Sequence, residues 1–189
     1  MSKASEIIVL CEDKLQKVFV LRFLKKGWKK GKYDVTVVPY PQGGSGGAGE
    51  KHVRDNYPRQ LTACRARHAG TILIVVMDAD AGTVDEHHRE LERACSCVQP
   101  PVGVRQASEP VVHVIPKRHI ETWLAYLGND DVDEDRSYRS DCGFRGCEAD
   151  CHSLVDRLAM ACKNREQLAD MPDSLGRACI EFERIRGLL

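Results

Sequence analysis

The segment Thr71-Ile-Leu-Ile-Val-Val-Met-Asp-Ala-Asp80 constrains the fold more than any other part of the sequence. Its apolar run, Ile72 to Met77, is typical of a strand buried on both faces of a sheet. Asp78 and Asp80 follow two residues apart, so their side chains should point the same way. We expect both carboxylates to face solvent at the carboxyl edge of the sheet, where open α/β sheets bind ligands. Their mutual repulsion would be relieved by a divalent metal ion.

Composition excludes some protein classes. The 189 residues are enough for a sizeable core, and the formal net charge of zero neither favours nor excludes a nucleic-acid partner. Nine cysteines, an odd number, and no apparent signal peptide argue against a secreted disulfide framework. No stretch approaches the roughly 20 apolar residues of a membrane helix. We therefore expect a soluble cytoplasmic protein with reduced thiols.

Strand-like and helix-like segments alternate along the chain. Hydrophobic patterns predict strands at 6–10, 33–40, 71–77 and 111–115, and helices at 13–26, 50–68, 83–97, 119–127, 151–163 and 173–187. Pro58 is expected to start or kink its helix. This alternation predicts an α/β fold with a mostly parallel four-stranded sheet flanked by helices. We divide the chain into an α/β domain, 1–128, and a C-terminal helical extension, 129–189, packed on it.

A third carboxylate joins the pair if two of the predicted strands are neighbours. Glu12 follows the strand at 6–10, as Asp78 and Asp80 follow the strand at 71–77. Three carboxylates at one sheet edge suit Mg²⁺ or Mn²⁺. The alternative interpretation is a strand-to-turn junction with solvated acids.

This pattern resembles the signature of Toprim domains, which occur in topoisomerases, bacterial primases, RNA-maturation nucleases and overcoming-lysogenization-defect (OLD) nucleases. The signature is carried here by Ile7-Ile-Val-Leu-Cys-Glu12 and Ile72-Leu-Ile-Val-Val-Met-Asp-Ala-Asp80. Ile115-Pro-Lys-Arg-His-Ile-Glu-Thr-Trp-Leu124 is similar to a segment of small stand-alone Toprim-like proteins, often found beside ATPases in bacterial defence loci. The resemblance covers about residues 5–127. It implies a Toprim-like Rossmannoid fold, a metal-dependent nuclease activity and an ATPase partner.

Other residues near the predicted edge have candidate roles. Lys117 would offset charge in the transition state, and Arg118 would bind the nucleic-acid backbone, although both also fit a solvated basic turn. Glu121 is interpreted as a metal ligand, as a hydrogen-bond acceptor behind one, or as a residue that favours the helix N-terminus through the dipole, and the resemblance favours a place in the site. Trp123 is predicted to be core. Asp13 is interpreted as a helix N-cap, with a fourth acid of the site as the alternative.

The stretch Gly43–Gly49 lacks the Gly-Lys-Ser/Thr ending of a phosphate-binding loop. One interpretation is a mobile loop that carries Lys51 and Arg54 to a nucleic-acid backbone, and the other is a plain linker. Cys142, Cys147 and Cys151 have loosely zinc-like spacing. Structural zinc is therefore one hypothesis, and buried thiols are the favoured one.

The leading functional hypothesis is a Mg²⁺- or Mn²⁺-dependent nuclease that cleaves DNA or RNA, working with an ATPase partner in antiviral defence. One alternative is a latent nucleic-acid-binding subunit of an ATPase complex. Another is a haloacid-dehalogenase-like phosphatase, which Asp78-Ala-Asp80-Ala-Gly-Thr83 approximates with an extra Ala81. Assembly into a homo-oligomer is left open.

Overall fold

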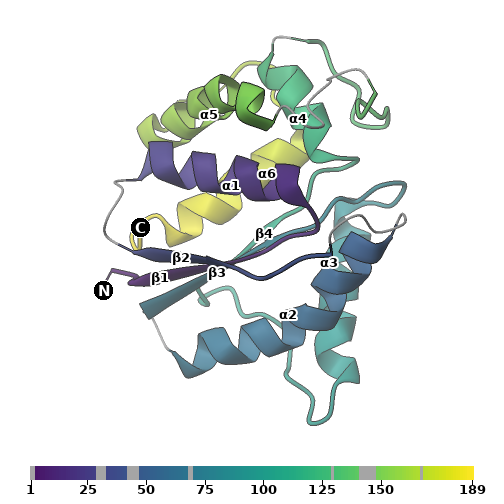
Figure 1. Ribbon diagram of the computed structural model, residues 1–189, viewed down its shortest axis with the longest axis vertical. Coiled ribbons are helices and arrows are strands. Elements are labelled where there is room, and N and C mark those ends of the chain that lie inside the picture. Colours follow the sequence, from purple (N-terminus) through teal and green to yellow (C-terminus); the bar gives the residue numbers. More distant parts are fainter. Residues whose placement is uncertain are drawn as a thin grey trace.

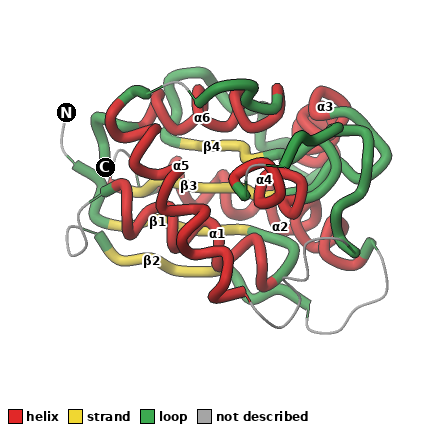
Figure 2. Tube along the Cα trace, turned by 90° about the horizontal axis from the view of Figure 1, so that it is seen from above, coloured by secondary structure: helices red, strands yellow, loops and turns green. Residues whose placement is uncertain are grey.

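The computed structural model describes residues 3–28, 33–41, 47–67, 70–128, 130–140, 148–166 and 168–189. A parallel four-stranded sheet runs through it in the order β2-β1-β3-β4 (Figures 1 and 2). The strands are β1 (Glu6–Leu10), β2 (Asp34–Val37), β3 (Thr71–Val76) and β4 (Val111–Val114). The predicted α/β class and the parallel sheet are confirmed. Because β1 and β3 are neighbours, their carboxyl ends lie side by side.

Six α-helices and one 3₁₀ helix accompany the strands in the described residues. They are α1 (Lys14–Gly27), α2 (Ala48–Ala66), α3 (Val84–Cys97), α4 (Ile120–Leu127), η2 (Glu148–Cys151), α5 (His152–Asn164) and α6 (Asp173–Ile185). Pro58 does not start a helix, because it lies inside α2, where it removes one helical hydrogen bond. The other alternative, that Pro58 kinks this helix, stays a prediction. None of the described helices combines the length and apolarity needed to cross a membrane.

The helices form two layers, one on each face of the sheet (Figure 1). One hydrophobic core lies between the sheet and α1, α4, α5 and α6, and the other lies between the sheet and α2 and α3. Successive residues of β3 alternate between these cores, with Ile72 and Ile74 in the first and Leu73 and Val75 in the second. The strand is therefore apolar on both faces, as its sequence predicts.

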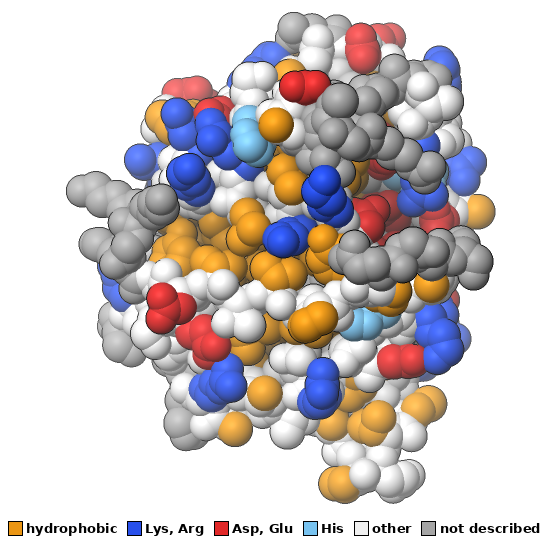
Figure 3. All heavy atoms as spheres, viewed as in Figure 1, with side chains coloured by type: hydrophobic (Ala, Val, Ile, Leu, Met, Phe, Trp, Pro, Cys, Tyr) orange, Lys and Arg blue, Asp and Glu red, His pale blue; other side chains and the backbone are white. Residues whose placement is uncertain are grey.

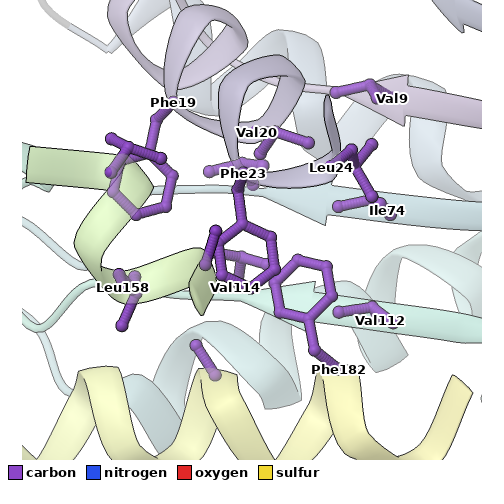
Figure 4. Close-up of a cluster of buried hydrophobic side chains, with 14 of the residues drawn as sticks. Val9, Phe19, Val20, Phe23, Leu24, Ile74, Val112, Val114, Leu158 and Phe182 are labelled. Atoms are coloured by element: carbon purple, nitrogen blue, oxygen red, sulfur yellow. The ribbon is translucent and has the colours of Figure 1, made fainter. Parts of the chain in front are cut away.

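The helices after residue 128 share the first core with the sheet. Phe23 of α1 and Phe182 of α6 lie with their ring centroids 4.6 Å apart, in the same cluster as the strand residues Val112 and Val114 (Figure 4). Asp156 of α5 pairs with Arg22 of α1. The helices after residue 128 thus pack on α1 and the sheet, while the division of the chain at residue 128 into a domain and an extension stays a prediction.

Candidate metal centre

Glu12 and Asp78 meet at the carboxyl edge, as the sequence predicts. In the register of β1 and β3, Leu10 lies opposite Val75, so the residues just after the strands remain adjacent. Glu12 Oε1 accepts a hydrogen bond of 2.9 Å from the backbone N–H of Asp78. The backbone N–H of Glu12 donates to Gln16 Oε1 at 3.0 Å. Glu12 is therefore held between the neighbouring strand and the first turn of α1.

The start of α1 is built by local capping. The Asp13 side chain accepts a hydrogen bond of 2.9 Å from the backbone N–H of Gln16, so the predicted N-cap is confirmed. Gly49 of α2 packs closely on the same turn, because a Cβ at this position would lie 2.7 Å from Glu12 Cβ. The absence of a side chain at Gly49 lets the N-terminus of α2 approach the candidate site.

Asp78 differs from the expectation. Only 1% of the residue is exposed, so the prediction that β3 presents it to solvent is wrong. Its Oδ1 atom is buried and has no hydrogen-bond partner among the described residues. Burial raises the pKa of Asp78 well above its usual range, and the charges of Glu12 and Glu121 add to the rise.

The carboxyl of Glu12 is perturbed in the same direction. Burial raises the pKa of Glu12 to about 8, the hydrogen bond from Asp78 lowers it, and the charge of Asp80 raises it further. Burial is thus the main cause of both raised pKa values, because it disfavours the ionised carboxylates. A bound cation would stabilise both in their ionised form.

Asp80 turns outward at the end of the same segment. Its backbone lies in the left-handed region, with φ of 44°, which Asp adopts more readily than most residues. Its N–H donates to Arg118 O at 3.0 Å, which continues the pairing between the segments that follow β3 and β4. The side chain is 45% exposed, and Oδ1 accepts from His119 Nε2 at 2.9 Å. Asp80 is therefore the carboxylate of this group that reaches solvent.

A cation that sequence patterns do not reveal spans the acidic residues. The Arg139 guanidinium lies 3.1 Å from Asp78 Oδ2, 3.7 Å from Asp80 Oδ1 and 4.0 Å from Glu121 Oε1. Glu121 is buried in the first turn of α4, so the structure brings this predicted residue to the site. No local motif marks Arg139; the only signal in the sequence is that clustered acids need a positive partner.

The predicted basic residues of the edge point elsewhere. Lys117 Nζ lies 2.6 Å from Asp135 Oδ1, and Arg118 Nε donates to Asp135 O at 2.8 Å. A second Arg118 nitrogen, Nη1, donates to the backbone O of Asp80 at 3.0 Å. Both cations therefore lie near Asp80, but their recorded contacts are with Asp135 and with the backbone O of Asp80. Acidic side chains gather on the right of the face drawn in Figure 3, with Lys and Arg side chains beside them.

Lys51 and Arg54 do not lie on a loop. Both belong to α2, which begins at Ala48, so the helix predicted from residue 50 is confirmed for them and they are not loop residues. Residues 42–46 of the glycine-rich stretch lie outside the described ones, so the choice between a mobile loop and a plain linker stays a prediction. Lys51 pairs with Asp55 at 2.5 Å and is 70% exposed. Arg54 contacts two glutamates of α2 and α3. Lys51 thus retains an accessible charge, whereas Arg54 is engaged within the protein.

Two further predictions from the sequence concern buried residues. Trp123 is fully buried and its Nε1 donates to Ser174 Oγ at 2.8 Å, so its predicted place in the core is confirmed. Cys151 is buried at the end of η2, but Cys142 and Cys147 lie outside the described residues. The zinc hypothesis therefore stays a prediction.

Comparison with known proteins adds no family assignment. No protein-family model, curated protein or solved structure matches this chain.

Proposed function

We propose that this chain is a metal-dependent nucleic-acid phosphodiesterase of the Toprim type, with Mg²⁺ or Mn²⁺ bound by Glu12, Asp78 and Asp80. The observation that carries the proposal is Asp78 Oδ1, a buried carboxylate oxygen without a hydrogen-bond donor among the described residues. A buried ionised oxygen left without a partner is costly. An oxygen-preferring divalent ion would supply that partner, with the remaining positions filled by water and substrate phosphate.

The residues around the carboxylates fit the metal by chemistry and by access. Glu12 and Asp78 supply oxygens from the interior, and Asp80 supplies one from the surface. When bound, the metal would activate water for attack on the phosphodiester and stabilise the leaving oxygen. Glu121, at the start of α4, would position the metal-binding carboxylates indirectly, through a cation or a water molecule that it shares with them.

Nearby cations support a polyanionic substrate. Lys117 pairs with Asp135, whose side chain is 76% exposed, and such surface pairs contribute little to stability. Exchange of that partner for a backbone phosphate would therefore cost little. We propose that Lys117 and Arg118 hold the phosphate backbone next to the acids and that Lys51 extends this contact.

We further propose that an ATPase partner controls the activity. This part rests on the resemblance to stand-alone Toprim-like proteins and on one geometric observation. Arg139 lies against Asp78, Asp80 and Glu121, where a divalent ion would compete with it for the same carboxylates. The isolated chain would then be latent until a partner or the nucleic acid draws Arg139 away.

The experiment is cleavage of labelled DNA and RNA by the purified chain in Mg²⁺ or Mn²⁺. Asp78→Asn keeps the size of the side chain and should abolish cleavage. The control is Asp34→Asn, an exposed acid at the first residue of β2, at the opposite edge of the sheet. Cleavage that survives Asp78→Asn contradicts the proposal.

If the wild-type chain does not cleave nucleic acid, metal binding can still be measured directly. Calorimetric titration with Mn²⁺ should then show binding to wild type and to Asp34→Asn, and weaker binding to Asp78→Asn. That result would support the latent form, and addition of the ATPase partner should restore cleavage. Equal Mn²⁺ binding by all three proteins would rule out the metal centre.

A further inference from the structure

A second group of metal-ligand side chains lies where α2 meets α3, on the opposite face of the sheet from α1. Glu50 is in the first turn of α2, and His87 and Glu90 are one turn apart on α3. One ligand atom from each of the three lies within 4.8 Å of the other two. Packing of the two helices therefore brings together one imidazole and two carboxylates from distant parts of the sequence.

His87 is oriented as a metal ligand. It is 7% exposed, and its Nε2 lies 3.0 Å from the backbone O of Ala79. That contact assigns the ring proton to Nε2, which leaves Nδ1 with a lone pair. Metal-binding histidines usually donate the proton of the other nitrogen to a carbonyl or carboxylate in this way.

The free nitrogen of His87 points into the group. Nδ1 is buried and makes no hydrogen bond within the described part of the chain, although Glu90 Oε2 lies only 3.1 Å away. The two atoms are close, but they do not form a hydrogen bond. The lone pair of His87 Nδ1 and the carboxylate oxygen Glu90 Oε2 could both bind one metal ion placed to the side of the two atoms.

Arg54 is the competing positive charge. Its Nη1 contacts Glu50 Oε1 and lies 3.3 Å from Glu90 Oε2. One guanidinium balances the charge of only one of the two carboxylates. Within the described residues it donates no hydrogen bond to the lone pair of His87 Nδ1. The side chains of Glu50 and Glu90 are 21% and 29% exposed, so an ion can reach them from solvent.

We propose that Glu50, His87 and Glu90 bind one divalent transition-metal ion, with Zn²⁺ as the best fit. The imidazole nitrogen favours Zn²⁺ over Mg²⁺ and Ca²⁺, which prefer oxygen ligands only. Ligand atoms at about 2.0–2.1 Å from a tetrahedral Zn²⁺ lie about 3.4 Å apart. The ligand atoms of the three residues, now within 4.8 Å of one another, must therefore move slightly closer together. Three protein ligands leave the fourth position for water. The ion would tie the N-terminus of α2, which packs on Glu12 through Gly49, to α3.

The test is binding of Co²⁺, a spectroscopic substitute for Zn²⁺, to the chelator-treated full chain. Wild type should give visible Co²⁺ bands without a thiolate-to-cobalt charge-transfer band, and Zn²⁺ should displace them. Glu90→Gln should weaken Co²⁺ binding at least about tenfold. Glu92→Gln, an exposed position on the same helix, should leave the affinity unchanged.

Two more variants distinguish Co²⁺ binding here from binding at the first carboxylate group and from a loss of fold. Asp78→Asn should retain the Co²⁺ bands, because the carboxylates at the ends of β1 and β3 are a different site. If Glu90→Gln does not fold by circular dichroism, Glu50→Gln should give the same loss of binding. Absence of Co²⁺ binding by wild type, bands dominated by thiolate charge transfer, or unchanged affinity in the glutamine variant would each overturn the proposal.

Discussion

Replacing Glu12 by Gln should change how the stability of the metal-free protein depends on pH. Burial raises the pKa of Glu12 from 4.5 to about 8, so between these values the folded chain retains a proton that the unfolded chain has released. The stabilising contribution of Glu12 is thus fully present below its unfolded pKa and is lost as the pH rises through about 8. This direction is opposite to that of a salt-bridged carboxylate, whose pKa is lowered by folding.

The magnitude follows from the same pKa values. At about 1.4 kcal/mol for each pH unit, a rise from 4.5 to about 8 sets an upper limit of about 5 kcal/mol on the contribution of Glu12. Asp78 shares the environment, and Arg139 supplies compensating charge 3.1 Å from its carboxylate. We therefore expect the free energy of unfolding to change by about 2–3 kcal/mol through Glu12 alone.

The assay is urea unfolding of metal-free wild type and Glu12→Gln at about pH 5 and about pH 8. Between these values, wild type should lose about 2–3 kcal/mol more stability than the variant. Groups with lowered pKa values, such as Asp156 and His113, are common to both proteins and cancel in the difference. Gln can still accept the hydrogen bond from Asp78. A wild type that loses no more stability than Glu12→Gln would refute the reasoning.

Three further substitutions test the packing and charge around the site. Arg139→Ala should raise the affinity for Mn²⁺ about tenfold in calorimetric titration, because a charge competitor worth about 1–2 kcal/mol is removed; unchanged affinity would exclude the competition. Gly49→Ala should lower the free energy of unfolding by about 1–3 kcal/mol, since the new Cβ would meet Glu12 Cβ at 2.7 Å. Gly176→Ala, in α6, should instead raise the free energy of unfolding by about 0.5–1 kcal/mol, because the new Cβ would have no neighbouring atom within 4 Å. Urea titration measures both variants, and a change opposite to the expected one in either variant would contradict its prediction.

The sheet and the meeting of Glu12 with Asp78 could be predicted because they depend on local patterns. The apolar run of β3 defines a strand buried on both faces, and alternation of strands with helices implies parallel neighbours. In a parallel sheet all carboxyl ends lie at one edge, so acids that follow two strands converge once these strands are adjacent. The N-cap at Asp13 was also predictable, since capping involves residues only three apart.

The burial of Asp78 and the role of Arg139 depend on contacts that the sequence does not encode locally. Asp78 is covered by segments far along the chain, including α4 through Glu121 and the segment that carries Arg139. The glycine-rich stretch hides the start of α2, because glycine lowers helix propensity without forbidding a helix. For that reason the sequence predicts this helix only from residue 50, whereas α2 begins at Ala48.

Charge balance gives Arg139 and a divalent ion related roles. Glu12, Asp78, Asp80 and Glu121 lie together at one edge of the sheet, and burial, with a smaller contribution from neighbouring acids, raises the pKa values of Glu12 and Asp78. Arg139 reaches three of these residues but leaves Asp78 Oδ1 without a partner in the described structure. A guanidinium also presents only donors in a plane, whereas an ion can be surrounded by oxygens on all sides. Arg139 therefore offsets part of the negative charge of these acids and leaves Asp78 Oδ1 for the metal ion that we propose.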